Sequence, residues 1–185
     1  MSEIVSDIVP GLRRIEPDEA PLIARFMRVH YKPAYAYLWT DGGEAYLRRE
    51  YDVDAIALAL RPHADTHDAE ADLVPLWITA NGATVGWTQW EVSPIDEGAA
   101  AGAYLHRLYL ATHAQGHGLG AWVLRRFRAF ARARDLDYCW VEVMSLGRAR
   151  GLYERAGYAF VREVELPYAH VKPGLGGLSV MRRGA

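Results

Sequence analysis

Hydrophobic residues recur at a helical spacing in three long parts of the chain. The first covers residues 17–31 and begins with a proline followed by two acidic residues. The second covers residues 43–60, and the third covers residues 118–134, where apolar side chains three and four positions apart form one stripe. A shorter stretch, residues 147–157, ends at a glycine in a helix C-cap position. The spacing therefore predicts about four helices.

Between these stretches the chain changes to runs rich in β-branched and aromatic residues, which are typical of strands. Seven such runs are present, at residues 11–15, 73–80, 84–92, 103–111, 137–144, 158–166 and 178–183. Asn81-Gly82 separates two of them and is the strongest short signal for a β-hairpin. Residues 61–72 are polar and acidic, and we expect them to form a loop.

The order of these elements predicts the fold class. Helices come first, followed by an antiparallel meander, one strand–helix–strand crossover, a short helix and a closing hairpin. We expect an α/β protein with a mixed, mostly antiparallel sheet of six or seven strands, in a single domain over residues 1–185. Residues 1–62 form its helical region, residues 73–165 its core and residues 166–185 its closing hairpin.

Composition narrows the classes of function without selecting one. The 185 residues are 51% hydrophobic and carry a formal net charge of −2, which gives no global argument for nucleic-acid binding. No window reaches the roughly 20 apolar residues of a membrane span. The acidic N-terminus lacks the basic region of a signal peptide, so we expect a cytoplasmic protein with no membrane partner. Cys139 is the one cysteine, and its apolar strand indicates a buried, inert thiol rather than a nucleophile.

A glycine-rich turn, AQGHGLGA, carries the clearest functional signal. It places Gly116, Gly118 and Gly120 between a predicted strand and the start of a predicted helix. Glycines allow positive φ and let the backbone approach a phosphate without a Cβ in the way. The first N–H groups of a helix also lack partners within the helix. The turn therefore predicts an anion site.

Three phosphate-binding patterns compete for this turn. A nucleotide P-loop needs Gly-Lys-Ser or Gly-Lys-Thr at its end, whereas Gly-Ala-Trp stands there. A dinucleotide fingerprint matches Gly116, Gly118 and Ala121, with Glu142 about 20 residues later. Antiparallel hairpins precede it, however, and too little chain follows for a doubly wound sheet. An NAD-dependent oxidoreductase stays open as an alternative, as does a glycine-rich helix start that binds nothing.

The third pattern, [Gln/Arg]-x-x-Gly-x-[Gly/Ala], is met by Gln115, Gly118 and Gly120 and resembles the signature loop of the GNAT superfamily of N-acetyltransferases. Residues 151–160, GLYERAGYAF, are similar to that family's second marker, an aromatic-bearing helix that leads into Gly-aromatic and a strand. The resemblance covers residues 73–165 well. It implies the GNAT fold, acetyl-CoA as cosubstrate with no metal, and direct acetyl transfer to a primary amine of a small molecule or peptide. A non-catalytic acyl-CoA-binding module stays open as a further alternative.

The resemblance also implies roles for individual residues. The pyrophosphate of acetyl-CoA would meet backbone N–H groups of Gln115, Gly116, His117, Gly118, Leu119 and Gly120. The pantetheine arm would pair with Leu108, Tyr109 and Leu110, and a backbone N–H near Leu108 would polarise the thioester carbonyl. Tyr153 stands at the family's aromatic acid position. Because a phenol is a weaker acid than a thiol, we expect Tyr153 to act mainly as a hydrogen-bond donor to the leaving sulfur; the alternative is a buried tyrosine that only packs.

The general base is the least determined position. Glu142 lies among apolar neighbours on a predicted strand, on the same face as Trp140 and Met144. It resembles the base glutamate of ribosomal-protein alanine N-acetyltransferases, and a structural ion pair with an arginine is the alternative. His106 and Glu91 are second choices, because histidine exchanges protons near neutral pH.

Several other residues near the expected site bear on the roles of Glu142 and Tyr153 and on possible ligands. Relatives often carry an asparagine seven residues before the tyrosine, where this chain has Leu146, and Ser145 is expected to cap the helix. His113 and His117 lack a third ligand within sequence reach, so we expect no metal. Four arginines surround the expected site: Arg125, Arg126, Arg148 and Arg150. We expect most of them on solvated helix faces, with one or two that meet the 3′-phosphate of CoA.

The helical region, residues 1–62, is where the family places acceptor specificity. It contains HYKPAYAYLWTDGGEAY, which combines Tyr and Trp side chains with Asp41 and Glu44. Aromatic rings beside carboxylates can enclose a cationic amine. The alternative is an aromatic-rich core or a dimer face, so a homodimer also stays open. The residues alone do not select the acceptor.

Overall fold

A seven-stranded sheet, with strand order β1-β2-β3-β4-β5-β7-β6, forms the centre of the computed structural model, which describes residues 8–61 and 73–185. The strands are Pro10–Arg14 (β1), Leu76–Ala80 (β2), Ala83–Pro94 (β3), Ala101–Leu110 (β4), Tyr138–Met144 (β5), Ala159–Glu165 (β6) and Gly177–Gly184 (β7). Neighbouring strands are antiparallel except for β4 and β5. The predicted mixed, mostly antiparallel sheet is confirmed.

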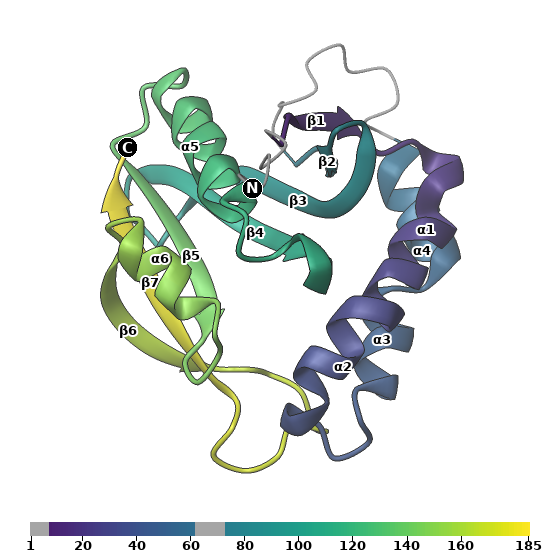
Figure 1. Cartoon of the computed structure of the whole chain (residues 1–185). Coiled ribbons are helices and arrows are strands. Elements are labelled where there is room, and N and C mark those ends of the chain that lie inside the picture. Colours follow the sequence, from purple (N-terminus) through teal and green to yellow (C-terminus); the bar gives the residue numbers. More distant parts are fainter. Residues whose placement is uncertain (1–7, 62–72) are drawn as a thin grey trace, which may run out of the picture.

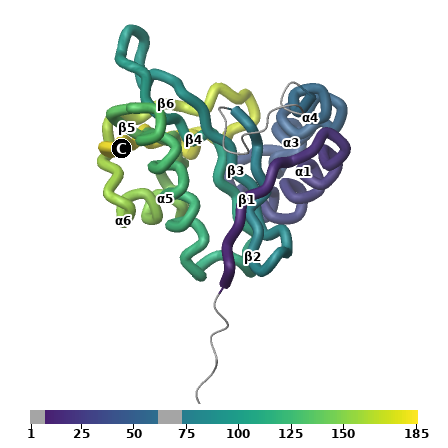
Figure 2. The backbone as a smooth tube through the Cα atoms, turned by 90° about the horizontal axis from the view of Figure 1, so that it is seen from above, coloured from purple at the N-terminus to yellow at the C-terminus, as the bar shows by residue number. Residues whose placement is uncertain are grey.

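Two groups of helices cover the sheet. The α-helices are Ala20–Phe26 (α1), Lys32–Tyr35 (α2), Glu44–Glu50 (α3), Val53–Leu60 (α4), Leu119–Arg132 (α5) and Arg150–Arg155 (α6). Figure 2 shows α1, α3 and α4 together at one side of the chain and α5 with α6 at the other. The apolar stripe of α5 packs in the larger core, where the Phe127 ring lies 5.7 Å from the Trp90 ring. A second core around Met27, Leu47 and Trp77 fills the space under α1 and α3.

The hairpin between β2 and β3 forms where the sequence predicts it. Asn81 and Gly82 have φ of 51° and 82°, and Ala80 faces Ala83 across the turn. Two consecutive positive φ values give the twist that a two-residue hairpin needs, which is why Asn-Gly is preferred there. The prediction is confirmed in both position and turn residues.

The predicted single helix over residues 43–60 is wrong, because the chain forms two helices there. Asp52 has an extended backbone (φ −64°, ψ 131°), and its side chain accepts a hydrogen bond from the Ala55 N–H at 3.0 Å. Asp52 is therefore the N-cap of α4, and α3 ends just before it. The break lets the Tyr51 ring turn inward and meet the Trp87 ring edge-on at 6.2 Å.

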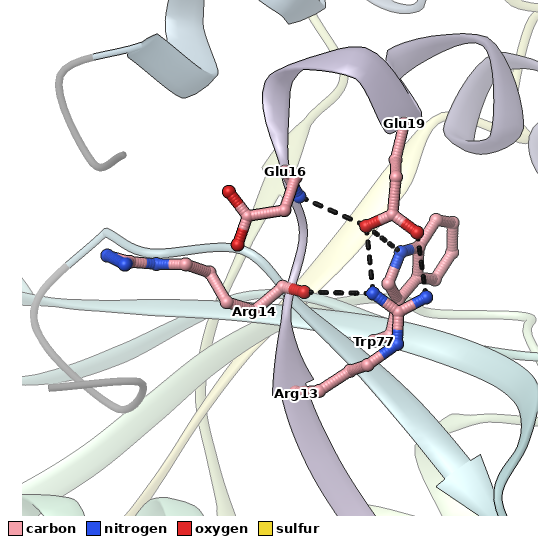
Figure 3. Close-up of polar contacts among 5 residues, drawn as sticks. All are labelled: Arg13, Arg14, Glu16, Glu19 and Trp77. Carbon is pink, nitrogen blue, oxygen red and sulfur yellow. Dashed lines mark hydrogen bonds and ion pairs between the residues drawn. The ribbon is translucent and has the colours of Figure 1, made fainter. Parts of the chain in front are cut away.

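A polar cluster ties the first helical turn to the sheet (Figure 3). The Glu19 carboxylate accepts hydrogen bonds from both Arg13 guanidinium nitrogens at 2.8 and 2.7 Å, from the Glu16 N–H at 3.0 Å and from Trp77 Nε1 at 3.1 Å. Arg13 also donates to the Arg14 carbonyl at 3.2 Å. These contacts, the Arg13 guanidinium foremost, hold the pKa of Glu19 below its ordinary value. The cluster fixes the angle at which the helical layer leaves β1.

The segment between β6 and β7 closes the fold against the helices. Trp39 and Val171 form an isolated bridge, and the Lys172 N–H donates to the Leu38 carbonyl at 2.9 Å. The closing hairpin thereby reaches the residues that link α2 to α3.

The expected loop over residues 61–72 lies outside the described residues except for Arg61. Within residues 8–61 and 73–185, no helix is long and apolar enough to cross a membrane.

Candidate active site

Strands β4 and β5 separate partway along their length. They pair in parallel at three positions: Ala103↔Cys139, Tyr104↔Trp140 and Leu105↔Val141. Beyond Leu105, no described strand pairs with the β4 edge that faces β5, although β3 follows the other edge as far as Leu110. Figure 1 shows the ribbons of β4 and β5 diverging toward their C-terminal ends. The resulting fork presents backbone polar groups to a ligand that adds in the manner of a strand.

The glycine-rich turn joins the open end of β4 to α5. The Gln115 side chain closes the turn by donating Nε2 to the Leu110 carbonyl at 3.0 Å. Gly116 and Gly118 have φ of +84° and +80°, and no other atom lies within 4 Å of an ideal Cβ built on either residue. Gly118 is the N-cap of α5, and no side chain caps that helix end. The first N–H groups of α5 therefore meet the requirements of an anion site.

Gly120 differs from its two neighbours and corrects the sequence interpretation. It lies inside α5 rather than in the left-handed region, so it does not supply positive φ. A Cβ at Gly120 would come within 3.0 Å of Leu152 Cδ2 and 3.8 Å of Leu110 Cδ1. Its small size lets α5 approach α6 and the end of β4, which brings the turn close to the helix that carries Tyr153.

Tyr153 extends from α6 into the larger core. It is 5% exposed, and its ring meets the Tyr158 ring edge-on at 5.7 Å. No hydrogen bond joins its hydroxyl to the residues that the structure describes. Burial raises the pKa of Tyr153, and the nearby phenols of Tyr35, Tyr109 and Tyr104 raise it further. A phenol with so high a pKa gives up its proton poorly, but it still donates a hydrogen bond.

The candidate bases meet at the base of the fork. His106 and Glu142 are the first residues past the last β4–β5 pair, one on each strand. His106 Nε2 lies 2.5 Å from Glu91 Oε1, and Glu142 Oε2 accepts a hydrogen bond from the Tyr104 hydroxyl at 3.3 Å. The Tyr104 ring lies 4.4 Å from the His106 ring and stacks on Trp140 at 3.9 Å. The structure thus brings the three predicted candidates together around one tyrosine.

These contacts distinguish His106 from Glu142. A carboxylate only accepts, so the contact with Glu91 implies that His106 Nε2 carries the proton and that Nδ1 is free to take one. The negative charge of Glu91 would also stabilise the positive charge that His106 acquires when it takes up a proton. Within the described part of the chain, Glu142 forms no ion pair with an arginine, so the alternative of a structural ion pair is not realised.

The aromatic residues expected near the acceptor mostly belong to the second core. Tyr31, Trp39 and Tyr46 are 8%, 3% and 9% exposed. The carboxylates beside them have local partners: Asp41 accepts from two backbone N–H groups at the start of α3, and Glu44 pairs with Lys32 and Arg28. The core interpretation is therefore the one that the structure bears out, and Asp41 and Glu44 are already engaged.

Two other expectations concern side chains around α6 and β5. Ser145 does not cap α6; its Oγ lies 3.0 Å from Ser179 Oγ and 3.3 Å from Glu163 Oε1, and the N-cap is Ala149. The reason is that the Ser145 N–H bonds the Gly177 carbonyl at 2.9 Å, which extends the sheet past β5. Cys139 is fully buried, as the apolar strand predicts, and burial raises the pKa of its thiol to about 11.

The basic and histidine residues around the turn are mostly at the surface. Arg150 pairs with Glu154 at 2.9 Å, one turn along α6, whereas Arg125 and Arg148 are exposed. His113 meets the His30 ring edge-on at 6.3 Å, and His117 is exposed on the turn. The described residues contain no group of three or more His, Cys, Asp or Glu side chains that could hold a metal ion.

Sequence reasoning missed one charged residue at the site. Arg107 lies on β4 directly before Leu108, and it lines a pocket beneath α3 and α4 together with Glu50 and Gln89. A cation between leucines in a strand, as in the sequence LHRL, is the signal that would have identified it.

Comparison with known proteins adds a family and a fold to this geometry. The model of the acetyltransferase (GNAT) family matches residues 25–158. No protein with a curated description matches the sequence. Among solved structures, PaiA N-acetyltransferase from Thermoplasma acidophilum, in complex with coenzyme A, has a TM-score of 0.71 at 15% identity, over 96% of this chain and 99% of that one.

Two further solved structures have the same fold. YncA from Salmonella typhimurium, with its cofactor acetyl-CoA, has a TM-score of 0.65 at 19% identity and covers 95% of this chain and 93% of its own. Ribosomal-protein-alanine N-acetyltransferase from Brucella melitensis has a TM-score of 0.65 at 17% identity, over 95% of this chain and 99% of that one. All three likenesses concern the fold, because the identities are low.

Proposed function

Because the chain belongs to the acetyltransferase (GNAT) family, we propose that it transfers the acetyl group of acetyl-CoA directly to a primary amine of a small molecule or peptide. The observation that carries this proposal is the fork between β4 and β5, which ends at the glycine-rich turn before α5. A strand-like arm with a pyrophosphate at one end fits such an arrangement of open strand edge and helix N-terminus.

The described residues fit acetyl-CoA at both ends of the fork. At the turn, Gly116 and Gly118 leave open the space that Cβ atoms would fill, so a phosphate can reach the backbone N–H groups there. Along β4, the edge at Leu108–Leu110 is free of strand partners on the β5 side among the described residues. Acetyl-CoA supplies a thioester, whose carbonyl a backbone N–H near Leu108 would polarise.

The acetyl transfer needs a base and a partner for the departing sulfur. The amine nitrogen forms a bond to the acetyl carbon, the carbon–sulfur bond breaks, and one proton leaves the nitrogen while the sulfur takes one up to become the CoA thiol. We assign the first proton to His106 Nδ1, since Glu91 holds Nε2 and stabilises the imidazolium. Glu142 is the second candidate, because it lies across the same tyrosine.

Tyr153 is the proposed partner of the sulfur. Its hydroxyl has no hydrogen bond to the described residues, and its raised pKa favours donation of a hydrogen bond over transfer of the proton. A donor placed before the reaction stabilises the charge that develops on sulfur without reorganising. The proton that the sulfur finally takes then comes from solvent or from the protonated base.

Thiol release tests the proposal directly. The purified protein is mixed with acetyl-CoA and with amino acids, polyamines or short peptides, and free CoA is followed with a thiol reagent while mass spectrometry identifies the acetylated amine. We expect at least one amine to accelerate release over the rate without amine. A protein that binds acetyl-CoA but accelerates release with none of them would be a non-catalytic binding module.

The two candidate bases are separated by the pair His106→Gln and Glu142→Gln. We expect His106→Gln to lower kcat about 100-fold, since a general base contributes about 10²- to 10⁴-fold. Glu142→Gln should keep kcat within about threefold of the original protein, because its carboxylate is only the second candidate. The reverse result would assign the base to Glu142.

A further inference from the structure

Arg107 is a largely buried cation without an anionic partner among the described residues. Its one hydrogen bond there runs from Nη1 to the His106 carbonyl at 3.3 Å. No carboxylate of residues 8–61 or 73–185 forms an ion pair with it, and no ring there forms a cation–π contact with it. A guanidinium has five N–H donors, so most of its donors are left for another group.

Arg107 lines a pocket of about 190 Å³. Its wall combines Trp87 and Gln89 of β3 with Tyr51 and the apolar side of α4. Glu50 also lines it, but this carboxylate lies 3.4 Å from Arg49 Nε and next to the Tyr168 phenol. Among the described residues that line the pocket, Arg107 therefore has N–H donors available for a ligand. The carboxylate of Glu50 already contacts Arg49 and Tyr168.

Arg107 stays charged at neutral pH, because a guanidinium is not deprotonated in proteins. The pKa of Arg107 is raised above its ordinary value: burial lowers it, and the phenols of Tyr51, Tyr109, Tyr46 and Tyr104, which become charged only at high pH, raise it. A buried charge that lacks a partner destabilises a fold by several kcal/mol at most sites. An anion from outside the chain would remove that cost and would use the planar, two-pronged geometry of arginine.

The position of Arg107 connects the pocket to the proposed reaction centre. It directly precedes Leu108, so their Cα atoms are about 3.8 Å apart. Tyr109, the next residue but one, lies near enough to influence both Arg107 and Tyr153 electrostatically. An anion held by the Arg107 side chain is therefore within reach of a small molecule whose amine is at the fork.

We propose that Arg107 binds an acidic group of the acceptor, so that the substrate is a small primary amine that also carries a carboxylate or a phosphate. This inference rests on the proposed acetyl transfer and adds the class of the acceptor. Glu50 also lines the pocket, and its carboxylate repels an anion, so Arg107 is the group there that attracts one. The apolar wall from α4 favours an acceptor with hydrocarbon between or beside its two polar groups.

Matched pairs of amines test this inference, because the members of each pair differ only in the acidic group. Suitable pairs are leucine with leucinamide, 4-aminobutyrate with butylamine, and phosphoethanolamine with ethanolamine. Rates of CoA release are expressed per unprotonated amine, since the amine pKa values differ within a pair. We expect the acidic member of at least one pair to have a kcat/KM about 10- to 100-fold higher, the range of a charge-assisted hydrogen bond. The carboxylate and phosphate pairs identify which anion is used.

The variants Arg107→Gln and Arg107→Lys then identify the group responsible. Arg107→Gln should raise KM for the acidic amine about 10- to 100-fold. The same variant should leave KM for the member without an acidic group within about threefold. Arg107→Lys should retain part of the preference for the acidic amine. Arg48→Gln, at an exposed arginine of α3, is the matched control and should change neither member. Calorimetry of the acidic amines with the CoA-bound protein gives the same comparison without turnover, and thermal unfolding shows whether each variant folds.

Three results would overturn the inference. The first is an equal kcat/KM for the two members of every pair, which would show that the acidic group is not recognised. Equal losses for both members in Arg107→Gln would assign Arg107 to the fold alone. Acidic amines that neither react nor bind to the CoA-bound protein would also refute it. If no amine of any kind reacts and acetyl-CoA does not bind, the proposed function itself fails.

Discussion

Tyr153→Phe removes one oxygen atom from the proposed reaction centre and leaves the ring in place. The ring is 5% exposed and packs against Tyr158, and the hydroxyl forms no hydrogen bond with the described residues. The free energy of unfolding should therefore change by less than about 0.5 kcal/mol, because no internal hydrogen bond is lost. If the hydroxyl stabilises the departing sulfur, kcat should fall about 100-fold, as for other preorganised donors.

The kinetic pattern is as informative as the size of the loss. The developing charge exists in the transition state rather than in bound acetyl-CoA, so KM for acetyl-CoA should stay within about threefold. Initial rates of CoA release at saturating amine, with acetyl-CoA varied, measure both constants. Thermal unfolding of the same preparations shows whether stability has changed.

Tyr158→Phe is the matched control for this substitution. Tyr158 is 4% exposed in the same core, and its hydroxyl has no hydrogen-bond partner in the described part of the chain. Removing that hydroxyl should leave kcat unchanged and should keep or raise stability by up to about 1 kcal/mol. The account of Tyr153 would be refuted if Tyr153→Phe kept kcat within about threefold of the original protein, or if both variants lost activity equally.

Three further predictions, one of them with a matched control variant, test the fold and the turn before α5. Glu19→Gln should lower the free energy of unfolding by about 1 to 2 kcal/mol at neutral pH. Because the fold lowers the pKa of Glu19, this difference should be present above the ordinary carboxyl range and should be lost as the pH falls through the lowered pKa of Glu19. Urea titrations at neutral pH and at a pH well below the ordinary carboxyl range measure the two cases. Equal differences at both pH values would show that charge is not involved. Gly118→Ala and Gly98→Ala both place a Cβ on a residue with positive φ and open surroundings, so each should cost about 1 kcal/mol of stability. Only Gly118→Ala should weaken CoA binding by calorimetry, and equal affinities for the two variants would argue against the turn as the phosphate site. Gly86→Ala would bring its Cβ to 2.3 Å from the Tyr109 carbonyl oxygen, so it should cost about 1 to 3 kcal/mol in thermal unfolding and displace the open end of β4; an unchanged melting temperature would contradict the close approach of β3 to β4 at this position.

The strands, the hairpin and the position of the glycine-rich turn could be predicted because each follows from local chemistry. Runs of β-branched and aromatic residues locate β2 to β5, and Asn81-Gly82 needs only its own backbone preferences to form the turn. The glycine pattern similarly locates the start of α5. The break between α3 and α4 was missed because hydrophobic spacing continues through it, whereas the cap at Asp52 depends on one side chain.

The face on which Arg107 lies could not be predicted from alternation. Strict alternation would place it with Leu105 on the side of α5. A β-bulge shifts the pairing between Gln89↔Arg107 and Trp90↔Leu105, so Arg107 turns toward the helical layer while Leu105 and Leu108 stay with α5. An extra residue in one strand has no sequence signature here, yet it decides which side chain faces the helical layer.

The hydrogen-bond partners of the candidate bases could not be predicted from the sequence either. His106 and Glu91 are 15 residues apart, and their contact depends on the register of β3 with β4. Glu142 was expected on the face of Trp140, and it lies beside that ring's stacking partner, Tyr104. Sequence reasoning thus named the titratable groups, and only the register could show that they meet where the strands separate.

Thermal unfolding with acetyl-CoA, free CoA and NAD in parallel tests the central claim most directly. A ligand at about 100 times its Kd adds about 2.7 kcal/mol to stability, which is readily measured. The account predicts that both CoA species stabilise the protein and that NAD does not, because the fork and the turn before α5 fit a CoA molecule. Stabilisation by NAD alone, or by none of the three, would contradict the assignment of the turn and every role that depends on it.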